Sequence, residues 1–151
     1  MFKNAEDLLK HIRDEKIEQL DLKVVDLPGR WRHLTLRAEG LDLKTLSRGM
    51  GLSLSPYPGY RKIQEGDMMA RPDPATAFLD PFFDRKTLGV ICDIYYPDGE
   101  TPYERNPRDI VRKAEKSIKK VIGVDAESRW LPEMEFYVLD GAKFGNTVNR
   151  S

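Results

Sequence analysis

The first hydrophobic positions of the chain recur at the spacing of one face of a helix. This stripe consists of Ala5, Leu8, Leu9 and Ile12. Asn4 stands directly before the stripe as an N-cap, and Asp7 follows three residues later, where a capping-box acid belongs. The pattern predicts a helix that begins near residue 5 and buries one face.

After this predicted helix, apolar and polar residues alternate along the chain. The alternation runs over residues 20–26 and again over 31–37, where Leu34 and Leu36 lie opposite His33 and Thr35. Between the two runs, the sequence Asp-Leu-Pro-Gly is typical of a turn. The pattern therefore predicts a β-hairpin.

The middle of the chain carries weaker signals. Residues 41–47 are compatible with one helical turn. Residues 49–61 are rich in glycine, proline, serine and tyrosine, which predicts a loop without regular structure. Residues 68–71 and 77–80 are short strand candidates, because a Pro-Asp-Pro sequence separates them.

Two longer patterns follow. Residues 87–95 are almost continuously apolar, which favours a central strand. Asn106 and Pro107 form a helix start, and Gly123 is a plausible end. The expected buried stripe of this helix contains Ile110, Ala114, Ser117, Ile118 and Val121. Residues 130–140 alternate again and predict a final strand.

The order of one helix, several strands, one helix and one strand defines an α+β protein. The β-rich part before residue 100 is large enough for one small sheet domain. We therefore expect one domain over residues 1–103 and the start of a second over residues 104–151.

Charge composition argues against two classes of partner. Lysine plus arginine number 25 and aspartate plus glutamate number 25, so the formal net charge is zero. This balance gives no support for a nucleic-acid or membrane partner. The apolar runs are too short to span a bilayer, and the first residues lack the apolar stretch of a signal peptide. We expect a cytoplasmic protein.

Few residues could bind a transition metal. Cys92 is the only cysteine and lies in the most hydrophobic strand, where a buried, inert thiol is expected. His33 is expected to be a half-exposed structural residue, and His11 to be solvated. A metal site would therefore consist mainly of carboxylates, which favours Mg²⁺ or Mn²⁺.

Glu133 and Glu135 are the strongest carboxylate candidates. In the predicted last strand they share one face, with Cα atoms roughly 7 Å apart. Trp130, Met134, Phe136 and Val138 form the opposite, apolar face. A divalent cation would neutralise the two neighbouring charges. A solvent-exposed face with two ordinary glutamates explains the spacing equally simply, and spacing alone favours that second interpretation.

Nucleotide and nucleic-acid motifs are absent from the sequence. Neither G-x-G-x-x-G nor G-x-x-x-x-G-K-[ST] occurs, so no cofactor-binding residues can be named. The predicted second helix is rich in basic residues but also contains Asp109 and Glu115, which favours a solvated helix face. These basic residues are Arg112, Lys113, Lys116, Lys119 and Lys120.

Several motifs in collinear order resemble those of bacterial type I glutamine synthetases. Residues 66–82 resemble the family segment D-M-x-x-x-P-D-x-x-T-A-F-x-D-P-F, and residues 131–137 resemble G-P-E-x-E-F-F. Residues 21–31 resemble the opening hairpin of the family, and residues 88–94 and 103–108 its next strand and helix start. The resemblance extends from about residue 1 to residue 140.

This resemblance implies a β-grasp-like amino-terminal domain, followed by the first helix and strand of the catalytic domain. Family members join ammonia to glutamate with ATP as co-substrate, through a γ-glutamyl phosphate, and use two Mg²⁺ or Mn²⁺ ions. They assemble as homo-oligomeric rings with sites at the subunit interfaces. Glu133 and Glu135 match the two metal-ligating glutamates of P-E-x-E, and with this context the metal-ligand interpretation is favoured.

Two departures from the family pattern matter. In the loop that normally reads G-x-G-F-D-[GA]-S-S, Ser53 occupies the position of the aspartate that binds and deprotonates ammonium. A neutral hydroxyl cannot hold a cation in this way. The remaining metal ligands and the ATP- and glutamate-binding residues of the family would all lie beyond Ser151, so no catalytic residue is intact here.

Three interpretations therefore stay open. The chain is part of a longer glutamine synthetase, an inactive truncated module that binds synthetase subunits, or part of a γ-glutamyl ligase for another amine.

Overall fold

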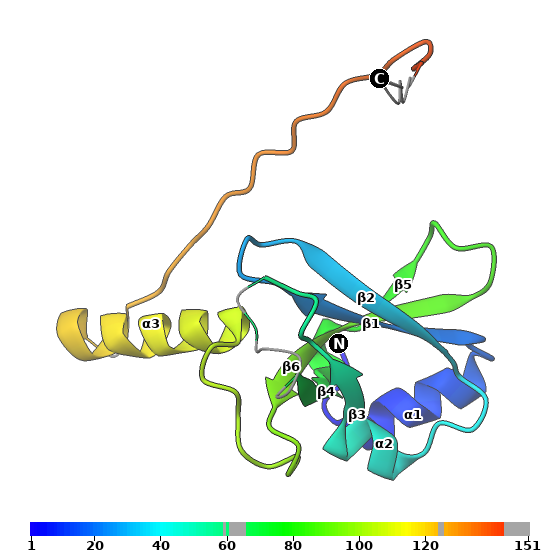
Figure 1. Cartoon of the computed structure of the whole chain (residues 1–151), viewed down its shortest axis with the longest axis horizontal. Helices are drawn as coiled ribbons and strands as arrows, with labels where there is room; N and C mark the ends of the chain where they lie inside the picture. Colours follow the sequence, from blue (N-terminus) through cyan, green and yellow to red (C-terminus); the bar gives the residue numbers. More distant parts are fainter. Residues whose placement is uncertain (59, 61–65, 124–125, 144–151) are drawn as a thin grey trace, which may run out of the picture.

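The fold is a mixed sheet of six strands with two helices packed against it, as a computed structural model shows (Figure 1). The structure describes residues 1–58, 60, 66–123 and 126–143. The helices are α1 (Ala5–Asp14), α2 (Leu43–Arg48) and α3 (Pro107–Ile122). The strands are β1 (Gln19–Val25), β2 (Trp31–Arg37), β3 (Met50–Ser53), β4 (Asp67–Pro72), β5 (Phe78–Asp80) and β6 (Thr87–Tyr95).

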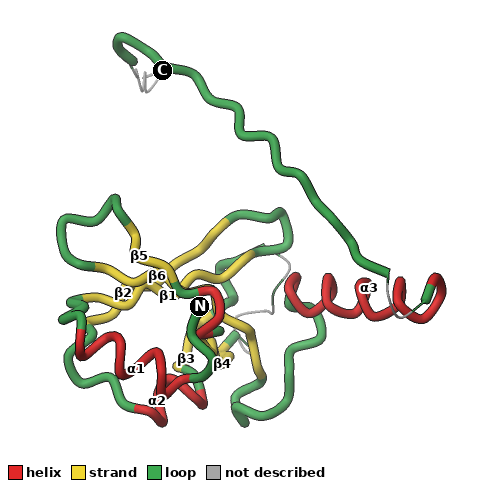
Figure 2. Tube along the Cα trace, turned by 180° about the vertical axis from the view of Figure 1, so that it is seen from behind, coloured by secondary structure: helices red, strands yellow, loops and turns green. Residues whose placement is uncertain are grey.

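The strand order is β2-β1-β6-β4-β3, and β5 also pairs with β6. β1 and β2 form the predicted antiparallel hairpin, in which Leu22 faces Leu34. β6 is the predicted central strand, since it pairs with β1 in parallel and with β4 and β5 in antiparallel. α1 and α2 lie side by side against the sheet (Figure 2).

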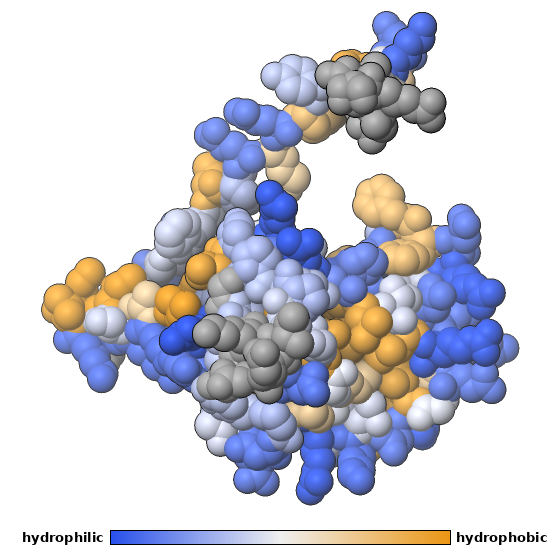
Figure 3. Space-filling view, in the orientation of Figure 1, coloured by the Kyte–Doolittle hydropathy of each residue, from blue (hydrophilic) through white to orange (hydrophobic). Residues whose placement is uncertain are grey.

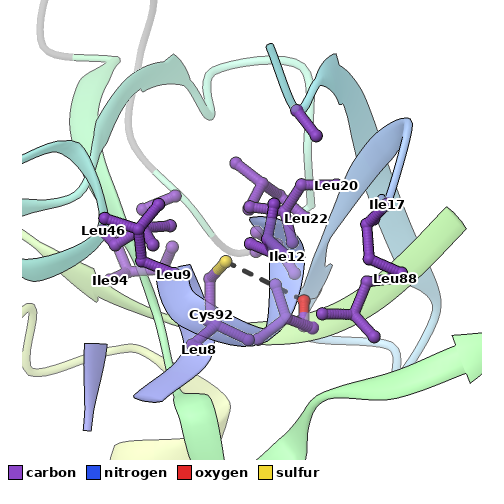
Figure 4. Close-up of a cluster of buried hydrophobic side chains, with 14 of the residues drawn as sticks. Leu8, Leu9, Ile12, Ile17, Leu20, Leu22, Leu46, Leu88, Cys92 and Ile94 are labelled. Carbon is purple, nitrogen blue, oxygen red and sulfur yellow. Dashed lines mark hydrogen bonds between the residues drawn. The ribbon is translucent and has the colours of Figure 1, made fainter. Parts of the chain in front are cut away.

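The core lies between these helices and the sheet (Figure 4). α1 contributes the predicted stripe, and Asn4 caps the helix by accepting a hydrogen bond of 2.8 Å from the backbone N–H of Asp7. The buried side chains from α1, β1 and β6 are Leu8, Leu9, Ile12, Leu20, Leu22, Val24, Leu88, Val90, Cys92 and Ile94. The sequence pattern thus identified the core of this sheet domain.

The prediction of an irregular loop over residues 49–61 is wrong in its first part. Residues Met50–Ser53 form β3 and pair with β4, with Met50 opposite Ala70. Gly49 serves close approach rather than a loop, because a Cβ atom on it would lie 2.7 Å from the Ala70 carbonyl oxygen. Residues 59 and 61, at the end of this predicted loop, lie outside the described residues.

α3 begins where the sequence predicted, but its predicted buried stripe is wrong. None of its described side chains is buried: Ile110 is 45% exposed and Val121 82%. Figure 3 shows hydrophobic residues exposed along this helix. The reason is that no described element covers the apolar face.

The predicted strand over residues 130–140 is also wrong. Residues 126–143 follow an extended path that leads away from the sheet and pair with no described strand (Figure 1). Trp130 and Met134, placed in the core by the sequence pattern, are both 86% exposed. A strand needs a partner for its backbone groups, and the described chain offers none here. The domain boundary near residue 103 stays a prediction.

Candidate functional site

Glu133 and Glu135 lie on the extended segment after α3, and both are exposed. Within the described part of the chain, no group of three or more His, Cys, Asp or Glu residues could hold a metal ion. Carboxylate oxygens suit Mg²⁺ and Mn²⁺, so the donor type fits the predicted cations. Two carboxylates alone fall short of the six oxygen ligands that Mg²⁺ requires. The pair therefore fits part of a metal site that other groups would complete.

Ser53 is the last residue of β3 and is exposed. Its hydroxyl oxygen lies 3.3 Å from that of Ser55. The backbone behind these serines is well fixed, because Leu54 is buried and its N–H donates a hydrogen bond of 2.8 Å to the Gly66 carbonyl. The position thus presents a neutral hydroxyl pair from a fixed backbone.

The structure does not bring these two predicted sites together. Figures 1 and 2 show the segment after α3 leading away from the sheet that carries Ser53. Ser53, Glu133 and Glu135 therefore do not form one site in this chain.

A charged network between α3 and the sheet was missed by the sequence analysis. Arg112 donates two hydrogen bonds to the Asp93 carboxylate, at 2.8 and 2.9 Å. Arg108 bonds the Asp73 carboxylate at 2.7 Å and lies 3.2 Å from Asp93. The hydrogen bonds to Asp93 raise the pKa of the Arg112 guanidinium above its ordinary value. Arg112 therefore docks the helix, which corrects its assignment to a solvated face.

These contacts are the main attachment of α3, since none of its side chains is buried. The sequence shows only the half of this network that lies on the helix. Arg108 and Arg112 are four residues apart and therefore lie on one helix face. Asp73 and Asp93 end up close together because β4 pairs with β6, with Pro72 opposite Cys92. The proximity of Asp73 and Asp93 depends on the register of the sheet, which the sequence alone does not supply.

A buried carboxylate organises the hairpin. Asp21 has no exposed surface and accepts hydrogen bonds from Lys23 Nζ at 2.7 Å and Thr35 Oγ1 at 2.7 Å. His33 Nδ1 lies 2.8 Å from the same carboxylate. Burial raises the pKa of Asp21, but the hydrogen bonds from Lys23, Thr35 and His33 outweigh it and hold the pKa below its ordinary value.

The other predicted residues agree with the structure in part. The side chain of His33 is 56% exposed and contacts Asp21, as expected of a half-exposed structural residue. Cys92 is buried, and burial raises the pKa of its thiol. His11, expected to be solvated, instead packs partly against the ring of Phe2, with ring centroids 4.7 Å apart. None of the three suggests a reactive group.

A mixed sheet with a parallel central pair and a helix packed across it is the arrangement of a β-grasp domain. Residues 16–97, which contain all six strands, match the family model described as the glutamine synthetase beta-Grasp domain. The chain belongs to the glutamine synthetase family. In the described residues, no helix is both long and apolar enough for a membrane crossing.

Known relatives extend the similarity beyond the sheet. The glutamine synthetase of Aquifex aeolicus is 40% identical over 144 residues, which cover 95% of this chain and 30% of that protein. The enzyme of Bradyrhizobium diazoefficiens is 37% identical over 145 residues, covering 96% of this chain and 31% of that protein. The chain therefore spans about 30% of the length of these curated relatives.

A solved structure supports the fold. The Plasmodium falciparum glutamine synthetase aligns with a TM-score of 0.70 and 23% identity, over 79% of this chain and 23% of that chain. At this level of identity the match shows the shared fold alone.

Proposed function

We propose that the chain supplies the β-grasp portion of an ATP-dependent ligase that joins ammonia to glutamate through a γ-glutamyl phosphate. The observation that carries this proposal is the match of residues 16–97 to the family's β-grasp model. The collinear similarity over 144 residues extends the argument to the segment with Glu133 and Glu135.

Glu133 and Glu135 would each hold one of two Mg²⁺ or Mn²⁺ ions. Such ions, when bound, offset the charge on phosphate oxygens during phosphoryl transfer. Both carboxylates are exposed here and therefore free to turn towards ligands that other parts of a complete enzyme provide. Glutamate and ATP would bind at interfaces of a homo-oligomeric ring, as in the family.

The docked α3 gives the sheet domain a role in this site. Arg108 and Arg112 fix the first turns of the helix on Asp73 and Asp93. Because the two glutamates follow α3 in the chain, this contact determines where the segment that carries them begins.

A hybrid protein tests the proposal. Residues 1–140 of this chain would replace the corresponding part of the Aquifex aeolicus enzyme, and ATP-dependent glutamine formation would be measured. We expect clear turnover, and a loss of at least about 100-fold when Glu133→Gln and Glu135→Gln are combined, because each removes a metal ligand. A hybrid that assembles but forms no more glutamine than the double variant would contradict the proposal and favour an inactive, subunit-binding module.

A ligase for another amine is the second candidate, because Ser53 stands where the family has its ammonium-binding aspartate. In the same hybrid, Ser53→Asp should raise kcat/KM for ammonia by about tenfold or more, since a carboxylate both attracts a cation and accepts its proton. Ser55→Asp is the matched control, two residues away. If both substitutions leave ammonia turnover unchanged, the assignment of this loop to amine binding is wrong.

A further inference from the structure

An open pocket of about 580 Å³ lies between the end of α1 and the end of the β1–β2 hairpin, and its lining includes neither Ser53 nor Glu133. Its apolar lining comes from core residues and is almost fully buried. These residues are Leu9, Ile12, Ile17 and Ala38. In Figure 3, hydrophobic surface is visible between β2 and α1. The volume lies within the range of small-molecule sites.

The rim of this pocket is cationic, although the whole chain has no net charge. Four basic residues line it against two acids, Glu18 and Glu39. The basic residues are Arg13, Lys16, Arg37 and Arg85. They come from α1, from the turn after it, from β2 and from the segment before β6, so four separate parts of the chain bring cations to one place.

Most of these cations are not neutralised within the described residues. The side chains of Arg13, Lys16 and Arg37 make no hydrogen bond or ion pair with another residue of the described chain. Arg85 reaches Glu18 only at 3.8 Å. Elsewhere in the molecule, Arg32, Arg108 and Arg112 each pair with an aspartate. Arg13 and Arg37 thus bring two guanidinium groups without a described partner to one pocket.

The backbone at the rim is also unusual. Lys16 has a φ of 51° and is the only non-glycine residue with positive φ in the described chain. Glycine or asparagine is the common choice at such a helix end, and a residue with a Cβ atom costs about 1 kcal/mol there. The helix carbonyls at this end are satisfied, because the N–H groups of Glu15 and Ile17 donate to His11 and Ile12 at 2.9 Å. These carbonyl groups therefore repel a nearby anion only weakly.

We propose that this pocket binds a small organic dianion, a molecule with two carboxylates or one phosphate monoester attached to a short apolar body. Guanidinium groups bind carboxylate and phosphate through paired hydrogen bonds, and Lys16 adds a further charge. The buried leucine and isoleucine side chains below them provide an apolar contact for the body of the ligand. No residue of the proposed reaction lines this pocket, so the inference is independent of the proposed function.

Four probes test the ligand chemistry on the chain itself: glutarate, phenyl phosphate, inorganic phosphate and the neutral glutaramide. Amide chemical shifts of Ala38 and Gly40 would report on the pocket. We expect saturable shifts with glutarate, with phenyl phosphate or with both, which identifies the anionic group. Glutaramide should cause none, and inorganic phosphate should bind at least about tenfold more weakly because it lacks an apolar body. Equal responses to glutarate and glutaramide would overturn the proposal.

Charge-matched variants separate a built site from general attraction. Arg13→Gln combined with Arg37→Gln should weaken binding of the better probe by at least about tenfold. Arg30→Gln combined with Arg105→Gln removes the same charge from exposed positions outside the pocket and should leave the affinity within about twofold. Equal losses in both double variants, or no loss in the first, would overturn the proposal.

Discussion

At the scale of single residues, Asp21 is expected to contribute to the stability of the fold. Its carboxylate is fully buried and depends on Lys23, His33 and Thr35 for hydrogen bonds. A buried charge with such partners is costly to disturb, because the replacing side chain stays buried with fewer hydrogen bonds.

We therefore expect Asp21→Asn to lower the free energy of unfolding by about 2 to 3 kcal/mol. Urea unfolding followed by circular dichroism measures this. Asp14→Asn, an exposed acid at the end of α1, is the control and should change stability by less than about 0.5 kcal/mol. Equal midpoints for all three proteins would show that the Asp21 contacts contribute nothing net.

The lowered pKa of Asp21 predicts how this effect depends on pH. A carboxyl whose pKa is lower in the folded than in the unfolded protein stabilises the fold above its unfolded pKa. That contribution is lost as the pH falls through the folded value. The stability difference between wild type and Asp21→Asn should therefore be full near pH 7 and shrink from about pH 5 downward. A difference that stays constant to about pH 2 would contradict this.

The burial of Asp21 also shows a limit of sequence patterns. Alternation placed it opposite Leu20 and Leu22, on a face that a hairpin alone would leave in water. In the structure β5 and β6 add cover, because Gly89 of β6 lies beside Asp21 and the ring of Phe78 from β5 lies over that glycine. A period of two identifies the faces of a strand, but only the sheet order tells which faces are covered.

At the scale of elements, the start of β3 depends on a glycine with a positive φ angle. Gly49 has a φ of 92°, and a Cβ atom there would meet the backbone of Ala70 at 2.7 Å. Gly51, two residues further, has open space around it.

We expect Gly49→Ala to destabilise the domain by about 2 kcal/mol or more, because the clash is with backbone and the conformation is strained. Gly51→Ala should be within about 0.5 kcal/mol of the wild type. Thermal unfolding of the two variants side by side measures the contrast. If both variants melt at the wild-type temperature, the close approach of β3 to β4 is wrong.

The attachment of α3 is the second test at this scale. Arg112→Gln removes the paired hydrogen bonds to Asp93, and we expect hydrogen exchange of the α3 amides to rise about fivefold, equivalent to about 1 kcal/mol at this half-exposed position. Added salt should increase exchange in the wild type as well. Lys113→Gln removes an exposed pair with Asp109 and an exposed hydrogen bond to the Glu104 carbonyl, both at 3.4 Å, and should have little effect. Similar exchange in both variants would show that the helix is held by other contacts.

Regular elements were predictable where their partners lie within the chain. The hairpin, α1 and β6 were correctly placed because each buries a periodic face in one core. The stripe of α3 and the alternation of residues 130–140 carry the same kind of pattern, yet both stay exposed. These patterns indicate faces suited to packing, while packing itself requires a partner that the described chain lacks.

At the scale of the whole molecule, the chain holds only part of the proposed site. Two exposed glutamates and a serine pair, lying apart, cannot position a nucleotide, two cations and an amine.

The purified chain, given glutamate, ammonia, ATP and Mg²⁺, should therefore form no detectable glutamine. It should also bind Mg²⁺ more weakly than about 1 mM, because two flexible carboxylates do not replace the water shell of the ion. Product analysis and calorimetry measure the two outcomes. Clear ATP-dependent turnover would show that the site is more complete than the structure indicates.

The collinear family motifs together predicted the β-grasp fold, which no single hydrophobic pattern did. The candidate site was predictable only as residue types: Glu133 and Glu135 follow from their motif, but their surroundings do not. The Asp73, Asp93, Arg108 and Arg112 network and the pocket rim were not predictable, since both depend on side chains that the fold brings together from distant segments.

The parallel pairing of β1 with β6 has a consequence for the order of folding. Gln19 pairs with Thr87 and Lys23 with Ile91. The first strand to be synthesised, β1, therefore cannot form this pairing until β6, the last strand of the sheet, has been synthesised. Contacts of such long range slow folding, because a large loop must close before they form. Until then the apolar faces of α1 and β1 lack the part of their cover that β6 supplies. The sheet therefore completes in one late step, after β6 has left the ribosome tunnel.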